Sequence, residues 1–169
     1  GGGRVLKELQ EDGFDYILCD SPAGIEKGAF LAMYYADRAV VVVNPEVSSV
    51  RDSDRIIGLL DSKTLRAENG KPLDARLLLT RYNPARVETG EMLSIVDVEE
   101  VLGLKCIGVI PESADVLNAS NKGEPVILDT ESSAGQAYDD AVARIIGEDR
   151  PMRFTQVEKK GFFSKLFGG

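Results

Sequence analysis

FDYILCDSPAG, residues 14–24, is the stretch around which the rest of the sequence can be interpreted. Its apolar run, residues 16–19, stops at Asp20 and is followed by small, turn-forming residues. An apolar run bounded in this way is typical of a strand buried on both faces of a parallel sheet. Ligands of open α/β sheets bind at the carboxyl ends of strands, so Asp20 and the loop after it suit Mg²⁺ and phosphate. The alternative is that Asp20 only begins a turn.

The length and composition predict one globular domain with a sizeable core. The chain has 169 residues, of which 43% are hydrophobic and 28% charged. A net charge of −8 argues against a general nucleic-acid binder, which needs Lys and Arg to neutralise phosphates. Histidine is absent, and the two cysteines, Cys19 and Cys106, lie in apolar runs where we expect them to be buried. These features disfavour a zinc site, a disulfide framework and a Ser–His–Asp triad.

Apolar runs alternate with helical patterns along most of the chain. Besides residues 16–19, strands are predicted over residues 38–43, 75–80 and 105–110. Residues 62–74 are predicted to form a loop and residues 126–128 a short extended stretch. Such alternation predicts right-handed parallel crossovers, hence a parallel sheet flanked by helices. Helices are predicted over residues 4–12, 26–36, 94–103, 113–121 and 133–146, and from a Ser48 or Ser49 cap to about residue 60.

The last residues have a different character. Plotted as a helix, Phe162, Phe163, Leu166 and Phe167 fall within an arc of about 140°. Lys160 and Lys165 border that arc, and Lys159 lies on its apolar side one turn earlier. This pattern predicts an amphipathic helix that lies on an anionic membrane. The alternatives are a helix docked on the protein's own core and a frayed tail. No signal peptide or membrane-spanning run is visible, so we expect a cytoplasmic protein bound peripherally and reversibly to an anionic membrane.

Several motifs, taken in order, resemble the MinD family of septum-site-determining ATPases, which belongs to the deviant Walker (ParA/MinD) class. They are CDSPAGI (19–25), NPEVSSVRDSDRI (44–56), LLLTRYNP (77–84), GVIPE (108–112), GEPVILD (123–129) and the terminal KKGF and LFGG. The resemblance implies a partial P-loop NTPase-like domain over residues 1–149, a linker over 150–157 and a membrane-targeting amphipathic helix over 158–169.

The resemblance also assigns roles to individual residues. It implies that Asp20 is the catalytic Walker B aspartate, which binds Mg²⁺ through water, and that ATP is the nucleotide. Residues matching the family's switch loop and adenine site are Ser21, Pro22, Ala23, Gly24, Arg81, Pro111 and Glu112. The implied dimer and partner face is Glu46, Arg51, Asp52 and Asp54. Without the resemblance, residues 51–55 would be interpreted as a solvated helix face. The implied membrane contacts are Lys159, Lys160, Phe162, Phe163, Lys165, Leu166 and Phe167.

The family's phosphate-binding loop is not found in this sequence. No G-x-x-x-x-G-K-[ST] pattern occurs, and Gly1-Gly2-Gly3 is followed by no lysine of that spacing. We expect the loop, together with central strands of the sheet, to belong upstream of residue 1. On this view the chain is inactive as an ATPase by itself and exposes a sheet edge.

Three functions follow from these features. The first is the carboxyl-terminal part of an ATPase that forms a homodimer with ATP, binds the membrane and recruits a MinC-like division inhibitor, with a MinE-like activator as second partner. The second is a non-enzymatic module that keeps only the membrane helix and the partner face. The third is a relative that positions DNA or other cargo, which the acidic charge and the Phe-rich end disfavour.

Overall fold

The computed structural model describes residues 1–21 and 27–157. Several predictions therefore lie outside the described residues. These are the switch-loop residues Pro22, Ala23 and Gly24, and the terminal residues Lys159, Lys160, Phe162, Phe163, Lys165, Leu166 and Phe167.

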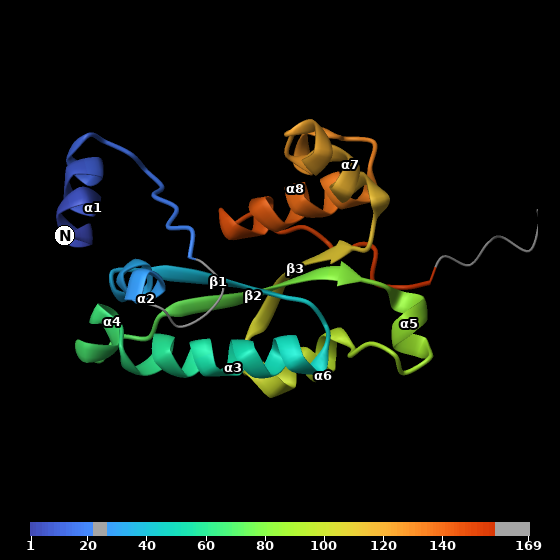
Figure 1. Cartoon of the computed structure of the whole chain (residues 1–169), viewed down its shortest axis with the longest axis horizontal. Helices are drawn as coiled ribbons and strands as arrows, with labels where there is room; N and C mark the ends of the chain where they lie inside the picture. The colour runs from blue at the N-terminus through green and yellow to red at the C-terminus, as the bar shows by residue number, and fades with distance from the viewer. Residues whose placement is uncertain (22–26, 158–169) are drawn as a thin grey trace, which may run out of the picture.

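A parallel three-stranded sheet forms the centre of the fold (Figure 1). Its strands are β1 (Arg38–Val43), β2 (Asp74–Tyr82) and β3 (Lys105–Pro111), in the order β1-β2-β3. β2 pairs with both neighbours, and both pairings are parallel. The predicted parallel sheet flanked by helices is confirmed, and three of the four predicted strands form.

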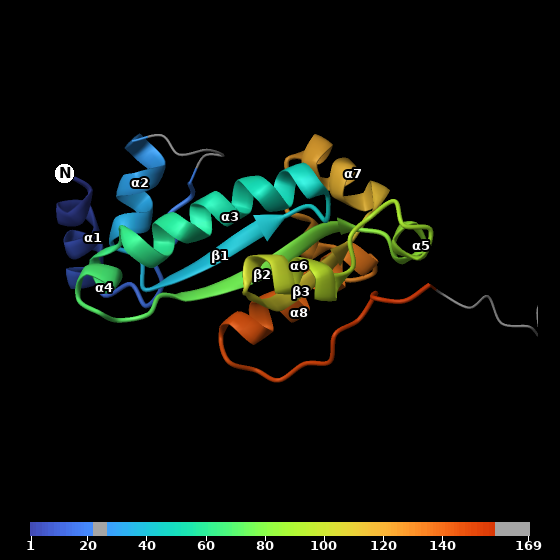
Figure 2. The same cartoon turned by 90° about the horizontal axis from the view of Figure 1, so that it is seen from below.

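Helices cover both faces of the sheet (Figures 1 and 2). α3 (Val47–Ser62) and α6 (Ile95–Leu102) pack on one face, where Leu77 and Leu79 of β2 are fully buried. α8 (Ser133–Ile145) packs on the other face against Leu78 and Ile110, and α7 (Ala114–Lys122) lies beside it. Successive apolar side chains of β2 thus pack alternately into two cores, one on each face of the sheet.

The remaining helices are short or lie at the margin. They are α1 (Gly2–Glu11), α2 (Lys27–Tyr34), α4 (Leu65–Glu68), α5 (Pro84–Glu88) and the 3₁₀ turn η1 (Val126–Leu128). α1 has no buried residue, although a Cβ at Gly3 would lie 2.8 Å from the ring of Tyr35. None of the helices in the described part of the chain combines the length and the hydrophobicity needed to cross a bilayer.

The caps of α6 form as predicted. Ser94 accepts a hydrogen bond from the Asp97 backbone, and the Asp97 carboxylate accepts one from the Ser94 backbone. The hydrogen bonds from Ser94 lower the pKa of Asp97. The helix ends at Gly103, whose φ of 63° is the left-handed conformation that glycine adopts at least cost.

The predicted buried strand at residues 16–19 is wrong for this chain. Residues 14–21 form no helix or strand, and Leu18 is 95% exposed. A strand is stabilised by hydrogen bonds to a neighbouring strand, and no strand of the described residues pairs with this segment. For the same reason Cys19 is exposed, against the prediction, whereas Cys106 is buried as predicted.

Three local predictions also need correction. α3 begins after Glu46 without a side-chain cap, because the Ser49 hydroxyl accepts a hydrogen bond from the Asn44 backbone instead. The predicted loop at residues 62–74 contains α4, whose first turn is capped by the buried Thr64. Residues 126–128 form the 3₁₀ turn rather than an extended stretch, since the Leu128 backbone donates to the Pro125 carbonyl.

Gly108 allows α8 to approach the sheet closely. A Cβ at this position would lie 2.6 Å from the Ala141 Cβ and 2.8 Å from the Leu78 Cδ1. Both neighbours are buried in the core under α8 and have little room to move. The small residue is therefore required by packing.

We expect Gly108→Ala to destabilise the fold by about 1–3 kcal/mol, through overpacking under α8. Gly58→Ala is the matched control, because a Cβ there meets nothing within 4 Å in the middle of α3. That variant should gain about 0.5–1 kcal/mol from helix propensity. Urea unfolding of both proteins measures the difference, and equal stabilities would contradict the packing argument.

Candidate functional site

The carboxyl ends of the three strands lie together at one end of the sheet, near α5 (Figures 1 and 2). We call this end of the sheet the carboxyl edge, or simply the edge. The last strand residues and the segments that follow them at this edge are residues 44–46, 81–84 and 111–113. Because parallel strands place the residues after them together, this edge is the place where an α/β sheet binds ligands. Among the predicted nucleotide residues, the structure brings Arg81, Pro111 and Glu112 to this edge.

Two side-chain hydrogen bonds link the strand ends. The Thr80 hydroxyl donates to Oδ1 of Asn44 at 2.8 Å, which joins β2 to the residue after β1. The Asn83 amide donates to Oε2 of Glu112 at 3.2 Å, which joins the residues after β2 and β3. Asn83 also caps α5 by accepting from the backbones of Ala85 and Arg86. Side-chain hydrogen bonds therefore connect the carboxyl ends of all three strands.

The backbone at the end of β2 is unusual. Arg81 is exposed and has a φ of 55°, a left-handed conformation that a residue with a Cβ adopts at a cost. Its neighbour Tyr82 is buried and is in register with Pro111, and the Glu112 backbone donates to the Tyr82 carbonyl. Burial raises the pKa of Tyr82, so its hydroxyl stays neutral. The buried Tyr82 holds the turn while Arg81 faces solvent.

Asp20 and Ser21 are not built into this edge. Both are exposed and belong to the irregular residues 14–21. Figures 1 and 2 show this segment between α1 and the sheet, at the opposite end from α5. The residues of the predicted adenine site, Arg81, Pro111 and Glu112, therefore lie together. The predicted Mg²⁺ ligand, Asp20, lies apart from them.

The predicted partner face lies along α3 and just before it. Glu46, Arg51, Asp52 and Asp54 are all exposed, whereas Val50, Ser53 and Ile57 of the same helix are buried. The helix therefore presents a charged side to solvent and an apolar side to the core. This arrangement suits either a solvated face or a polar protein partner.

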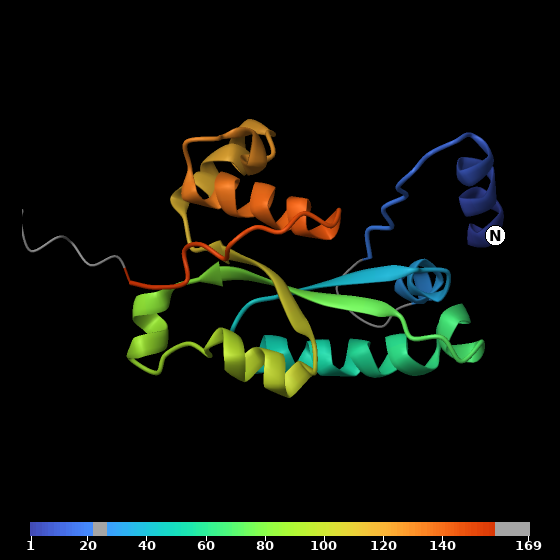
Figure 3. The ribbon, with the colours of Figure 1, turned by 180° about the vertical axis from the view of Figure 1, so that it is seen from behind.

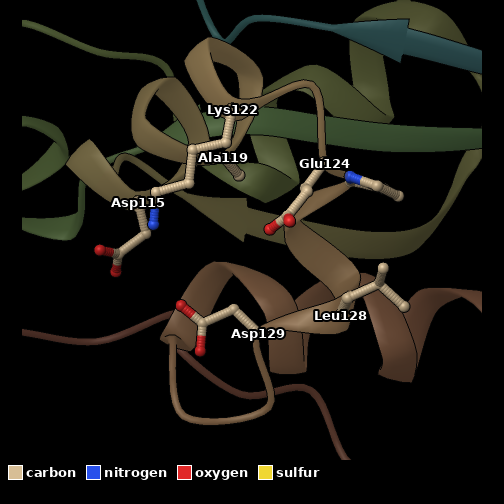
Figure 4. Close-up of a pocket in the computed structure, with 7 residues that line it drawn as sticks. Asp115, Ala119, Lys122, Glu124, Leu128 and Asp129 are labelled. Carbon is tan, nitrogen blue, oxygen red and sulfur yellow. The ribbon is translucent and has the colours of Figure 1, made fainter.

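A cavity of about 220 Å³ lies between α7 and η1 (Figure 4). It contains no predicted site residue. Asp129, in its wall, accepts hydrogen bonds from the backbones of Glu131 and Ser132 and so serves the turn before α8. No group of three or more carboxylate or cysteine side chains in the described ranges could hold a metal ion. The lining residues are Asp115, Ala119, Lys122, Glu124, Pro125, Leu128 and Asp129.

Comparison with known proteins supports the resemblance found in the sequence. The septum site-determining protein MinD of Escherichia coli strain K12 is 60% identical over 170 aligned positions, which cover 100% of this chain. This chain is homologous to MinD proteins along its whole length. It spans 63% of the length of the E. coli protein, and no protein-family model matches it.

Solved structures agree with this relationship. MinD of Aquifex aeolicus superposes with a TM-score of 0.81 at 41% identity, over 90% of this chain and 62% of the Aquifex protein. A MinC:MinD complex from the same organism gives 0.80 at 41% identity, over 91% and 61%. The MinD of Pyrococcus horikoshii in complex with Mg-ADP shares the fold, with a TM-score of 0.71 at 24% identity over 86% and 56%.

The sequence alone did not single out Asn44 and Asn83 as site residues. Each is the first amide side chain after a strand, so its position at a parallel strand end was a usable signal. The hydrogen bonds they make depend on the order of the strands. That order places the residues after β2 between those after β1 and β3.

We expect Thr80→Val to destabilise the chain by about 1 kcal/mol, since it leaves the Asn44 amide oxygen without the hydroxyl donor. Thr80→Ser keeps the hydroxyl and serves as the control. Thermal unfolding of both variants gives the difference. If the serine variant lost as much stability as the valine variant, the methyl group rather than the hydrogen bond would be responsible.

Proposed function

We propose that this chain is the carboxyl-terminal part of a MinD-like ATPase that places the division septum. In this function the complete protein binds Mg-ATP, forms a homodimer, attaches to the cytoplasmic face of the inner membrane and recruits a MinC-like inhibitor. The observation that carries the proposal is the 60% identity to MinD that extends over the whole chain.

The residues at the strand ends suit the base side of a nucleotide. Arg81, Pro111 and Glu112 lie at the carboxyl ends of the paired strands β2 and β3, where they can contact an adenine. Asp20 would hold Mg²⁺ through water, and the metal would neutralise charge on the phosphates when bound. Phosphoryl transfer also needs cations around the transferring group, and the predicted nucleotide residues include one, Arg81. We therefore assign no hydrolytic step to these residues alone.

Uncovered apolar groups support a larger assembly around this sheet. Among the described residues β1 pairs with β2 alone, and its Val40 and Val42 side chains are exposed. Tyr16 and Leu18, in the segment that resembles a buried strand, are exposed as well. In our proposal a phosphate-binding part adds strands between residues 16–19 and β1, which buries these groups and brings Asp20 to the nucleotide.

The exposed side of α3 is the proposed partner surface. Glu46, Arg51, Asp52 and Asp54 carry both signs of charge, which suits polar, orientation-specific contacts. We assign to it the dimer contact, a MinC-like partner and a MinE-like activator. The solved Aquifex complex contains MinC and MinD.

A non-enzymatic membrane module is the second candidate. It is favoured by the scarcity of phosphate-binding cations among the predicted nucleotide residues. Co-sedimentation with anionic liposomes, with and without Mg-ATP, separates the two candidates when a version ending at Val157 is run beside the full chain. The decisive result is liposome binding with and without Mg-ATP by the 169-residue chain and by a form completed with an upstream half. If both bind equally in the two conditions, the membrane module is supported and ATP-dependent membrane binding is contradicted.

Asp20→Ala, made in a chain completed with an upstream MinD half, should lose Mg-ATP-dependent dimerisation, because the Mg²⁺ shell loses its carboxylate. Asp15→Ala removes an exposed carboxylate from the same segment and should dimerise normally. Size-exclusion chromatography with light scattering reads the result. If the Asp20 variant dimerises normally, Asp20 has no role in binding Mg²⁺ and only begins a turn.

Phe163→Glu should reduce liposome binding by at least about tenfold, because it places a charge in the middle of the apolar arc. Ser164→Glu adds the same charge outside that arc and is the matched control. The assay is sedimentation with anionic vesicles, with circular dichroism to verify folding. Equal binding by the two variants would contradict the interfacial helix.

A further inference from the structure

The residues after α8 do not leave the domain directly. Figure 3 shows the chain reversing after α8 and running back along the helix toward α5. We call residues 150–154 the strap. The strap is fastened to α8 and β3 by three sets of contacts.

Asp140 of α8 forms the first set. Its side chain is only 7% exposed and accepts a hydrogen bond from Arg153 Nε at 2.7 Å and one from Arg150 Nη1 at 3.3 Å. Burial by itself would raise the pKa of Asp140, but the bonds from Arg153 and Arg150 outweigh it and hold the pKa below its ordinary value. A buried carboxylate with two charged donors is costly to leave unpaired, so both arginines are held.

Arg144 forms the second set. Its guanidinium donates to the carbonyls of Ile107, Arg150 and Pro151, at 3.0, 3.0 and 2.7 Å. One side chain of α8 thus connects β3 to the beginning of the strap. The planar guanidinium makes all these bonds in a fixed geometry, which defines the path of the backbone.

Phe154 forms the third set. It packs against the apolar cluster of Leu78, Ile110 and Ala137 under α8. Its φ of 61° is left-handed, a conformation that persists when surrounding contacts determine it. The Arg153 guanidinium lies 5.2 Å from the centre of its ring, within cation–π range. The side chain anchors the end of the strap in the core.

We propose that the strap fixes the point at which the terminal basic and aromatic residues leave the domain, and that Asp140 is the positioning residue that fastens it. Figures 1 and 2 show the end of the described chain beside α5, at the carboxyl edge of the sheet. The terminal segment therefore starts next to the candidate nucleotide edge. Because the strap is held on the domain, the free part of the chain after it is shorter. In a dimer bound to a membrane by one terminal segment, this raises the effective concentration of the other terminal segment at that membrane. This last consequence rests on the proposed function.

The test compares Asp140→Asn with Asp139→Asn. Asp139 is the matched control, because it is the neighbouring carboxylate on α8 and also bonds Arg150, but its side chain is 61% exposed. Spin labels are placed at Glu88→Cys in α5 and at Gln156→Cys after the strap, in a Cys19→Ser background. Cys106 is buried, and burial raises the pKa of its thiol, which keeps it unreactive.

We expect the distance between the two spin labels to have one narrow distribution in the parent and in the Asp139 variant. In the Asp140 variant we expect a broad distribution. Trypsin should also cut the Arg153–Phe154 bond at least about tenfold faster in the Asp140 variant. A narrow distribution and unchanged cleavage in Asp140→Asn would overturn the proposal. If that variant does not fold, Phe154→Ala takes its place, and the same two readings decide.

Liposome binding of the same proteins separates this proposal from the proposed function. If the strap is released in the Asp140 variant but the parent does not bind anionic vesicles, the strap stands and the membrane function fails. If the parent binds vesicles and the Asp140 variant keeps its narrow distribution, the strap proposal fails alone.

Discussion

The double pairing of β2 is the constraint on which the described structure depends. This strand is hydrogen-bonded on both edges and buried on both faces, with Leu77 and Leu79 in one core and Leu78 in the other. A strand in this position cannot shift its register by one residue without exchanging its two faces. β1 and β3, and the helices that cover them, are therefore placed by reference to β2.

The candidate site is a consequence of that constraint. Because all three strands run parallel, the residues after them arrive at one edge, and the order β1-β2-β3 puts the β2 end in the middle. Thr80 reaches Asn44 on one side and Asn83 reaches Glu112 on the other. The buried Tyr82 holds the turn in which Arg81 is exposed with its left-handed backbone. The hydrogen bonds at this edge are thus centred on β2, the middle strand of the described sheet.

The sequence predicted the features that depend on local chemistry. The four valines of β1 and the Ser94–Asp97 capping box carry their signals within a few residues, and both formed where expected. Features that depend on distant partners were not predictable. Residues 16–19 have the composition of a buried strand, but a strand needs neighbours, and the pairing of Asp140 with Arg150 and Arg153 is set by how the chain returns along α8.

The two faces of the sheet differ in a way that bears on the whole protein. α8 covers β2 and β3 on its side, with Gly108 allowing close contact, whereas Val40 and Val42 of β1 are exposed. Two exposed valines on the same face of an edge strand are unfavourable in water and promote association. The exposed Tyr16 and Leu18 add a second apolar surface with the composition of a buried strand. In the proposed function the phosphate-binding part would cover both surfaces, which makes them two sides of one proposed contact rather than independent defects.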